Sequence, residues 1–369
     1  MKSEGEYGKM PITYPYFGSI TYIFEILMRG LGREDIIHPK KPSKKTAHLD
    51  SLYSPEFVCT PFKITLGTFI ESLEAGAYEL AFGASQGTCR LGYYYPIQKM
   101  ILTELGYDFK FITFDWDHPW ECVQQFKKIS DDYNLTQTIC AFRIAWIKSR
   151  YIDLVDKLLR YYRALEINKG SSDSIAEQAF QLILEAKGMG NIRKLKKKIT
   201  NLFQKEIEIN RNSNPIKIGV VGEIYVVHEP TLNLDIYRKL NDLGVVCNTH
   251  NTVGKLFDIG KKLNPFVREH YNISRKTAKP YLPYNCGGCA QDSIGDTILC
   301  KRQGWNGMIH LYPFTCLPEI IARSILPQIS KKYGMPVLSL VVDEQTGEAG
   351  FQTRLEAFVD LLVRKKDEE

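Results

Sequence analysis

Short apolar runs alternate with longer amphipathic stretches over the first third of the 369-residue chain. Strand candidates at residues 11–14, 78–82 and 109–114 alternate with helical patterns such as those at 20–31 and 94–105. Strands joined through helices of this length pair in parallel, because the helix carries the chain back across the sheet. This pattern predicts an α/β domain.

The same rhythm returns after residue 214, where dense β-branched and apolar runs again alternate with helical stretches. The strand candidates here are residues 216–221, 245–247, 307–314 and 336–342. The carboxyl-terminal part is therefore expected to form a second parallel sheet covered by helices.

Between these parts, residues 134–211 show long helical patterns and no strand signal. Apolar residues there recur at the spacing of an amphipathic helix. The chain is therefore predicted to be an α/β protein with two Rossmann-like parallel-sheet domains, 1–132 and 214–369. A helical connector, 133–213, joins them.

Composition and charge describe an ordinary globular protein, with 44% hydrophobic residues, 24% charged residues and a net charge of +6. The basic runs at 40–45 and 193–198 lack interleaved aromatics and are typical of solvated helix faces, so no nucleic-acid partner is expected. No apolar stretch could span a bilayer, and the first residues lack the apolar core of a signal peptide. The chain is predicted to be cytoplasmic, without a membrane partner.

Nine cysteines in a reducing compartment are not expected to form disulfides, so those in special contexts are candidate metal ligands or nucleophiles. Cys59 stands at the start of a helical pattern, while Cys89 and Cys316 each lie between a strand candidate and a helical pattern. Backbone N–H groups and the helix dipole lower a thiol pKa at such a position. The alternative is a buried thiol that packs as a small hydrophobe.

A C-x-x-C turn, formed by Cys286 and Cys289 around two glycines, adds a second cysteine motif. It could be half of a zinc knuckle, but Cys300 and Cys316 do not supply a second pair at matching spacing. A thioredoxin-like redox pair is a weaker alternative because of the Gly-Gly spacer. Core packing is expected for Cys122, Cys140, Cys247 and Cys300.

Ligands of parallel α/β sheets gather outside the carboxyl ends of the strands. Cys89, Cys316, Glu223 and the pair Asp343-Glu344 all follow strand candidates. Two α/β domains that face each other could bring such thiols and carboxylates to one interdomain cleft.

Three further side chains stand near the candidate ligands. Lys63 and Arg90 are close in sequence to Cys59 and Cys89, and an anionic metal cluster needs compensating cations. His310 lies in an apolar run and is expected to be a satisfied core histidine, with a supporting role near the third cysteine left open.

The loop after the last strand candidate carries more charge than a tight turn needs, with Asp343, Glu344, Glu348 and Arg354. One carboxylate is predicted to relay protons or gate the site, with Arg354 fixing its orientation. The alternative is a solvated loop.

Five segments spread over nearly the whole chain resemble a known family. They are SPEFVCTPFK (54–63), GTCRLGYY (87–94), GEIYVVHEP (222–230), HLYPFTCLPE (310–319) and DEQTGEAGFQTRLEAF (343–358). The family comprises the iron–sulfur subunits of 2-hydroxyacyl-CoA dehydratases and benzoyl-CoA reductases. The resemblance is to their activase-associated branch, the acyl-CoA dehydratase activase-related proteins or CoA protein activases.

The resemblance implies that Cys59, Cys89 and Cys316 hold an iron–sulfur cluster at the domain junction, either 4Fe–4S or a larger double-cubane type. Cys286 and Cys289 depart from the characterised dehydratases and are candidate additional ligands. The implied partners are a separate ATP-hydrolysing iron–sulfur activator, a homologous second subunit or second copy, and an acyl-CoA. The chain has no phosphate-binding loop motif, consistent with ATP being handled by the activator.

Two functions follow as hypotheses from this resemblance. In the first, the chain is a lyase resembling 2-hydroxyacyl-CoA dehydratases, or an oxidoreductase component of anaerobic metabolism, and performs radical dehydration or reduction of an acyl-CoA or small substrate. In the second, it is a non-catalytic iron–sulfur relay or scaffold of an activase system. A zinc-binding protein is the remaining alternative.

Overall fold

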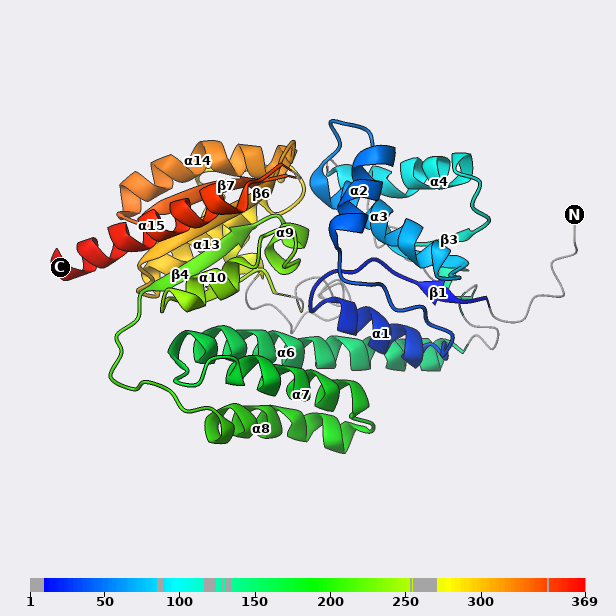
Figure 1. Ribbon diagram of the computed structural model, residues 1–369, viewed down its shortest axis with the longest axis horizontal. Helices are drawn as coiled ribbons and strands as arrows, with labels where there is room; N and C mark the ends of the chain where they lie inside the picture. The colour runs from blue at the N-terminus through cyan, green and yellow to red at the C-terminus, as the bar shows by residue number, and fades with distance from the viewer. Residues whose placement is uncertain are drawn as a thin grey trace, which may run out of the picture. The chain divides into compact units, whose positions relative to one another are not determined.

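The computed structural model describes residues 10–84, 89–115, 124–127, 129, 134–252, 254, 271–343 and 345–368. The chain divides into two compact units, Met1–Ala145 and Trp146–Glu369. Among these described residues, each unit contains one sheet, and the strands of both sheets are paired in parallel (Figure 1). The predicted α/β class with parallel sheets is thus confirmed.

The first unit holds a three-stranded sheet in the order β1 (Ile12–Thr13), β2 (Glu79–Ala84), β3 (Lys110–Asp115). Its core includes Phe62 and Phe69 of helix α3, which cluster with buried residues of β2. The described helices are α1 (Thr21–Gly30), α2 (Lys44–Tyr53), α3 (Thr60–Glu74), η1 (Arg90–Tyr93) and α4 (Tyr94–Glu104).

The long helices expected in the middle of the chain are present as α6 (Leu135–Leu165), α7 (Ser171–Glu185) and α8 (Met189–Glu206). From Trp146 onward they belong to the second unit. The ring of Tyr162 on α6 packs against Phe203 on α8. Although α6 is long, no helix of the described ranges is apolar enough over a sufficient length to cross a membrane.

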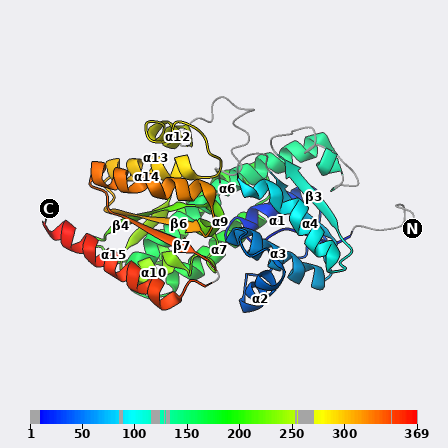
Figure 2. The ribbon, with the colours of Figure 1, turned by 90° about the horizontal axis from the view of Figure 1, so that it is seen from above.

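The sheet of the second unit has the strand order β5-β4-β6-β7. Figure 2 shows α13 and α14 over one face of this sheet and α10 and α15 over the other. The strands are β4 (Lys217–Gly222), β5 (Val246–Thr249), β6 (Gly307–Pro313) and β7 (Val337–Val342). The described helices are α9 (Ile224–His228), α10 (Ile236–Asp242), α12 (Tyr271–Ala278), α13 (Ala290–Arg302), α14 (Leu317–Tyr333) and α15 (Glu348–Glu368).

Element boundaries differ from the sequence pattern mainly at α15. The pattern predicts this helix from about residue 353, but it begins at Glu348. Phe351 and Leu355 are both buried one helical turn apart, so core packing extends the helix across Gly350. Tertiary contacts thus outweigh the low helix propensity of glycine.

Gly222 ends β4 at the point where the chain leaves the sheet, and only glycine fits there. Its φ is +142°, and a Cβ at this position would lie 1.7 Å from the carbonyl oxygen of Leu311 on β6. The next residue, Glu223, donates its backbone N–H to that same oxygen over 3.1 Å. This close approach fixes where Glu223 emerges at the carboxyl edge of the sheet.

Replacing Gly222 by alanine should therefore destabilise the second unit severely, by at least about 3 kcal/mol, because the clash is with backbone that cannot move independently. The measurement is the urea midpoint of the far-ultraviolet circular dichroism transition. Gly350→Ala is the control, since a Cβ there meets nothing within 4 Å and should be neutral or stabilising. Equal midpoints for the two variants would contradict this account.

Candidate functional site

Of the cysteines that the structure describes, four occupy the position immediately before a helix. Cys59 precedes α3, Cys89 precedes η1 and then α4, and Cys316 precedes α14, as the sequence pattern predicts. Cys289 precedes α13, a helix that the pattern predicts only from residue 293, so its position is a finding of the structure. None of the four thiols makes a capping hydrogen bond to its own helix. Each cysteine thus stands at a helix start, a position where backbone N–H groups and the helix dipole favour a thiolate or another anion.

In the first unit, a thiol–hydroxyl contact and an arginine hydrogen bond help to hold together the segments that carry Cys59 and Cys89. The Cys59 thiol lies 2.6 Å from the hydroxyl oxygen of Tyr94, in the first turn of α4. Arg90, the residue after Cys89, donates from Nη1 to the carbonyl oxygen of Phe57 over 3.0 Å. The structure therefore places two predicted ligands on neighbouring helix starts of one unit.

The two cations expected beside these cysteines have different surroundings. Lys63 is buried and lies four residues after Cys59 on α3, which places both on one side of the helix. Arg90 is exposed, and its described hydrogen bond holds the loop before α3. Lys63 is thus the better placed of the two to compensate a buried negative charge near Cys59.

In the second unit, the C-x-x-C turn packs on the first turn of α14. A Cβ on Gly288 would approach the Pro318 ring to 2.9 Å, and Pro318 lies two residues after Cys316. Burial raises the pKa of the Cys289 thiol well above its usual range, and the negative charge of Glu319 raises it further. The same two causes raise the pKa of Cys286. Both thiols are therefore protonated at neutral pH, and a metal cation that binds the sulfur atoms would displace the protons.

Glu319 is a fully buried carboxylate that joins three elements at this edge of the sheet. Its Oε2 accepts a hydrogen bond from Ser293 Oγ of α13 over 2.9 Å and lies 2.8 Å from His310 Nε2 of β6. His310 Nδ1 in turn lies 3.3 Å from Ser339 Oγ of β7. His310 is thus a satisfied core histidine, as expected. Its carboxylate partner was not predicted, because the two residues meet only when α14 folds back on β6.

The chain is strained directly before Cys316. Thr315 has φ +64°, a left-handed conformation that a β-branched residue adopts at a cost of roughly 1–3 kcal/mol. The Cys316 N–H donates to the Pro313 carbonyl oxygen over 3.1 Å and closes this turn. Such strain persists only where the surrounding structure imposes it, so the position of Cys316 is tightly specified.

Glu223 and Asn251 complete this edge of the second unit. The Glu223 side chain accepts from the Val226 N–H at the start of α9 over 3.0 Å. Burial raises the pKa of Glu223 to about 7, against the lowering effect of its backbone hydrogen bonds. Asn251 Nδ2 bonds to the Gly222 carbonyl oxygen over 3.2 Å and lies 3.8 Å from the Cys289 sulfur. The sequence indicated Glu223 by its place after a strand, but gave no signal for Asn251.

The charged loop after β7 is tied into its surroundings. Glu348 forms an exposed ion pair with Lys239 over 2.6 Å. Arg354 Nη2 donates to the Ser339 carbonyl oxygen over 3.1 Å. Asp343 Oδ1 accepts from Thr346 Oγ1 over 2.8 Å and closes the turn. Glu344 lies outside the described residues.

The remaining cysteines were expected to pack in the core. Cys247 and Cys300 are buried, and burial raises the pKa of Cys247 to about 12. Cys140 is exposed, so the prediction for it is wrong. Its neighbour Ala141 points inward instead, because the buried stripe of α6 passes one position further along the helix. Cys122 lies outside the described residues.

No group of three or more His, Cys, Asp and Glu side chains is arranged to hold a metal ion within the residues that the structure describes. No protein-family model matches the chain, and no curated protein matches it either. The cysteines, their helix starts and the buried carboxylates are the features of this site that can carry chemistry.

The raised pKa of Glu223 predicts a specific pH dependence of stability in the metal-free protein. A carboxyl group with a raised pKa in the folded state binds its proton more tightly there, so stability is lost as pH rises from about 4.5 to about 7. The loss should be on the order of 3 kcal/mol, from about 2.5 pKa units at about 1.4 kcal/mol per unit. Glu223→Gln should remove this slope in urea unfolding measured between pH 4.5 and 7.5.

The control is Glu348→Gln. The neighbouring Lys239 lowers the pKa of Glu348, so this carboxyl group does not contribute to a loss of stability between pH 4.5 and 7.5. If the Glu223 variant kept the slope of the wild-type protein, the assignment would be wrong.

Proposed function

We propose that the chain is an iron–sulfur protein in which Cys59, Cys89 and Cys316 hold a 4Fe–4S cluster or one part of a double-cubane cluster. In this proposal the two parallel-sheet units meet at the cluster, with a thiolate pair from the first and one thiolate from the second. The observation that carries it is that all three cysteines stand at helix starts, where a thiolate is stabilised.

The residues present fit such a group. Thiolates are the ligands that iron–sulfur clusters select, and a three-thiolate set leaves one iron open to a further ligand. Lys63 offers a buried cation near Cys59. The C-x-x-C turn packs beside the start of α14, which supports Cys286 and Cys289 as additional ligands.

When bound, the cluster would supply one-electron transfer at low potential, for radical dehydration or reduction of an acyl-CoA or a small substrate. The chain itself would hold and orient the sulfur atoms. Tyr94 positions the Cys59 sulfur, while Glu319 and His310 fix the helix start behind Cys316. Cys59 is buried, while Cys89 and Cys316 are partly exposed.

The proposed partners follow from the same chemistry. A separate ATP-hydrolysing iron–sulfur activator in the cytoplasm would deliver the electron, since the sequence has no phosphate-binding loop motif of its own. A homologous second subunit or a second copy of the chain would complete the assembly. The alternative is a relay or scaffold that accepts the electron and passes it to another protein.

A zinc site is the second candidate, and one observation favours it. The Oε1 atom of Glu319 is buried without a hydrogen-bond partner in the described structure, and its charge acts on both Cys286 and Cys289. Two thiolates and a carboxylate are ligands that zinc accepts. Metal analysis separates the two cases, because zinc would come without acid-labile sulfide.

We expect the anaerobically purified protein to be brown and to contain iron and sulfide. Cys59→Ala, Cys89→Ala and Cys316→Ala should each abolish the cluster, because two thiolates do not retain a cubane. Cys286→Ala and Cys289→Ala should change its spectrum or iron content while some cluster remains bound. The measurements are iron and sulfide analysis and electron paramagnetic resonance.

Cys140→Ala is the matched control for these variants, since Cys140 is exposed and should leave the iron content unchanged. Zinc without acid-labile sulfide in the wild-type protein would contradict the proposal. If the C-x-x-C variants lost all iron while Cys59→Ala and Cys89→Ala kept it, the site would have to be rebuilt around Cys286, Cys289 and Cys316.

The enzyme and the relay differ in their response to substrate. For an enzyme, a CoA thioester added to the activator-reduced protein should change the cluster spectrum, and Glu344→Gln, Glu348→Gln or Arg354→Lys should lower turnover if the loop relays a proton or gates the site. Reduction by the activator without any thioester response would identify a relay. If turnover and cluster potential were unchanged in all three variants, the loop would have only a structural role.

A further inference from the structure

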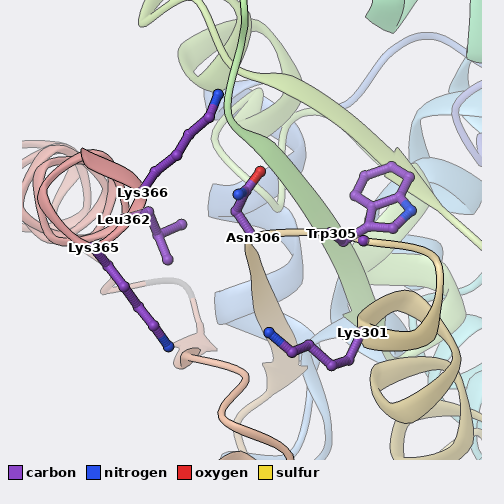
Figure 3. A pocket seen from close by; sticks show the side chains of 7 residues that line it. Lys301, Trp305, Asn306, Leu362, Lys365 and Lys366 are labelled. Atoms are coloured by element: carbon purple, nitrogen blue, oxygen red, sulfur yellow. The ribbon is translucent and has the colours of Figure 1, made fainter. Parts of the chain in front are cut away.

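A pocket lies at the amino-terminal edge of the second sheet, where Trp305 and Asn306 lead into β6 and α15 ends (Figure 3). Its cavity volume is about 130 Å³, well below the ~300–1,000 Å³ of pockets for drug-sized ligands. It is lined by Lys301, Gly304, Trp305, Asn306, Leu362, Lys365 and Lys366. The lining therefore contains three ammonium groups and no carboxylate.

The ammonium groups of the three lysines use only part of their hydrogen-bonding capacity within the protein. Lys365 donates to the Gly334 carbonyl oxygen over 2.9 Å, and Lys366 donates to the Asn214 carbonyl oxygen over 2.7 Å. Each ammonium group has three N–H donors, so both retain donors for a ligand. The Lys301 ammonium group makes no hydrogen bond or ion pair with any described residue, and Figure 3 shows Lys301 and Lys365 extending into the same space.

Asn306 contributes a neutral donor with a fixed orientation. Its Oδ1 accepts the Lys217 N–H over 2.8 Å, which identifies the other amide atom as Nδ2. Figure 3 shows Nδ2 on the side of Leu362, where the pocket lies. An acceptor in the pocket could therefore bond to Asn306 without disturbing β4.

The positive charge of the three lysines exceeds the negative charge of the helix carboxyl ends near the pocket. The carboxyl ends of α13, α14 and α15 each carry the equivalent of about half a negative charge, about −1.5 in total. The three lysines carry +3, so the pocket keeps a net positive charge of roughly 1.5 on the same scale. Asp367 and Glu368 follow on α15 but do not line the pocket. A small anion with several acceptor oxygens would satisfy the free donors.

We propose that this pocket binds a phosphoryl group, either as inorganic phosphate or as the end of a phosphate monoester. The group would bridge Lys301 on α13, Asn306 before β6 and Lys365 on α15, and so stabilise the amino-terminal edge of the sheet. This site lies at the opposite end of the strands from Glu223 and Cys316, and it does not depend on the proposed cluster.

Isothermal titration of the full chain with inorganic phosphate, at ionic strength held constant with chloride, tests the proposal. The wild-type protein should bind one phosphate saturably, and Lys301→Gln should weaken binding at least tenfold. Asn306→Asp should abolish it, because the variant keeps the acceptor for the Lys217 N–H but replaces the donor with a negative charge. Lys331→Gln, an exposed lysine in the last turn of α14, is the matched control and should bind as the wild type does.

Titration with glycerol 3-phosphate distinguishes the two sources of the group. Tighter binding of the ester than of inorganic phosphate would assign the pocket to an esterified ligand, and equal or weaker binding would assign it to free phosphate. The proposal would be overturned if the wild-type protein showed no saturable binding, or if Lys301→Gln and Asn306→Asp bound phosphate as tightly as Lys331→Gln.

Discussion

The buried carboxylate of Glu319 is the interaction on which the carboxyl edge of the second unit depends. It joins α14 to α13 through Ser293 and to β6 through His310, which reaches β7 through Ser339. A carboxylate without exposure is costly to bury unless it is hydrogen-bonded, so these partners have to be held in place together. The start of α14, with Cys316, is positioned as a consequence.

Parallel α/β topology gives the two edges of this sheet opposite chemistry. Every helix that returns the chain starts at the carboxyl ends of the strands, so helix N-termini gather at one edge and C-termini at the other. Thiols and carboxylates, including Cys289 and Glu223, stand at the first edge, where N–H groups favour negative charge. Lysines such as Lys301 and Lys365 stand at the second, where they meet helix carbonyl groups. One physical cause thus accounts for both the proposed metal chemistry and the cationic pocket.

Thiol chemistry at the first edge is a balance between two opposing effects. Helix starts favour the thiolates, whereas burial and the neighbouring Glu319 raise the pKa of Cys289. A bound cation or a positively charged metal core would shift this balance toward the thiolate. In the first unit, the Cys59 sulfur lies beside the Tyr94 hydroxyl, and the buried Lys63 follows four residues later.

The sequence by itself determined the α/β class, the parallel sheets and the helix-start positions of Cys59, Cys89 and Cys316. These features rest on hydrophobic periodicity and on residues that are neighbours in the chain, so a local pattern suffices to predict them. Only the tertiary structure decided that Glu319 meets His310, that Cys140 faces outward, and that Lys301 of α13 shares a pocket with Lys365 and Lys366 of α15. The physical reason is that these contacts join residues far apart in the sequence. They depend on the order of the strands in the sheet and on which face of each helix packs inward. The periodicity of apolar residues predicts that a face is buried, but not which residue it will contact.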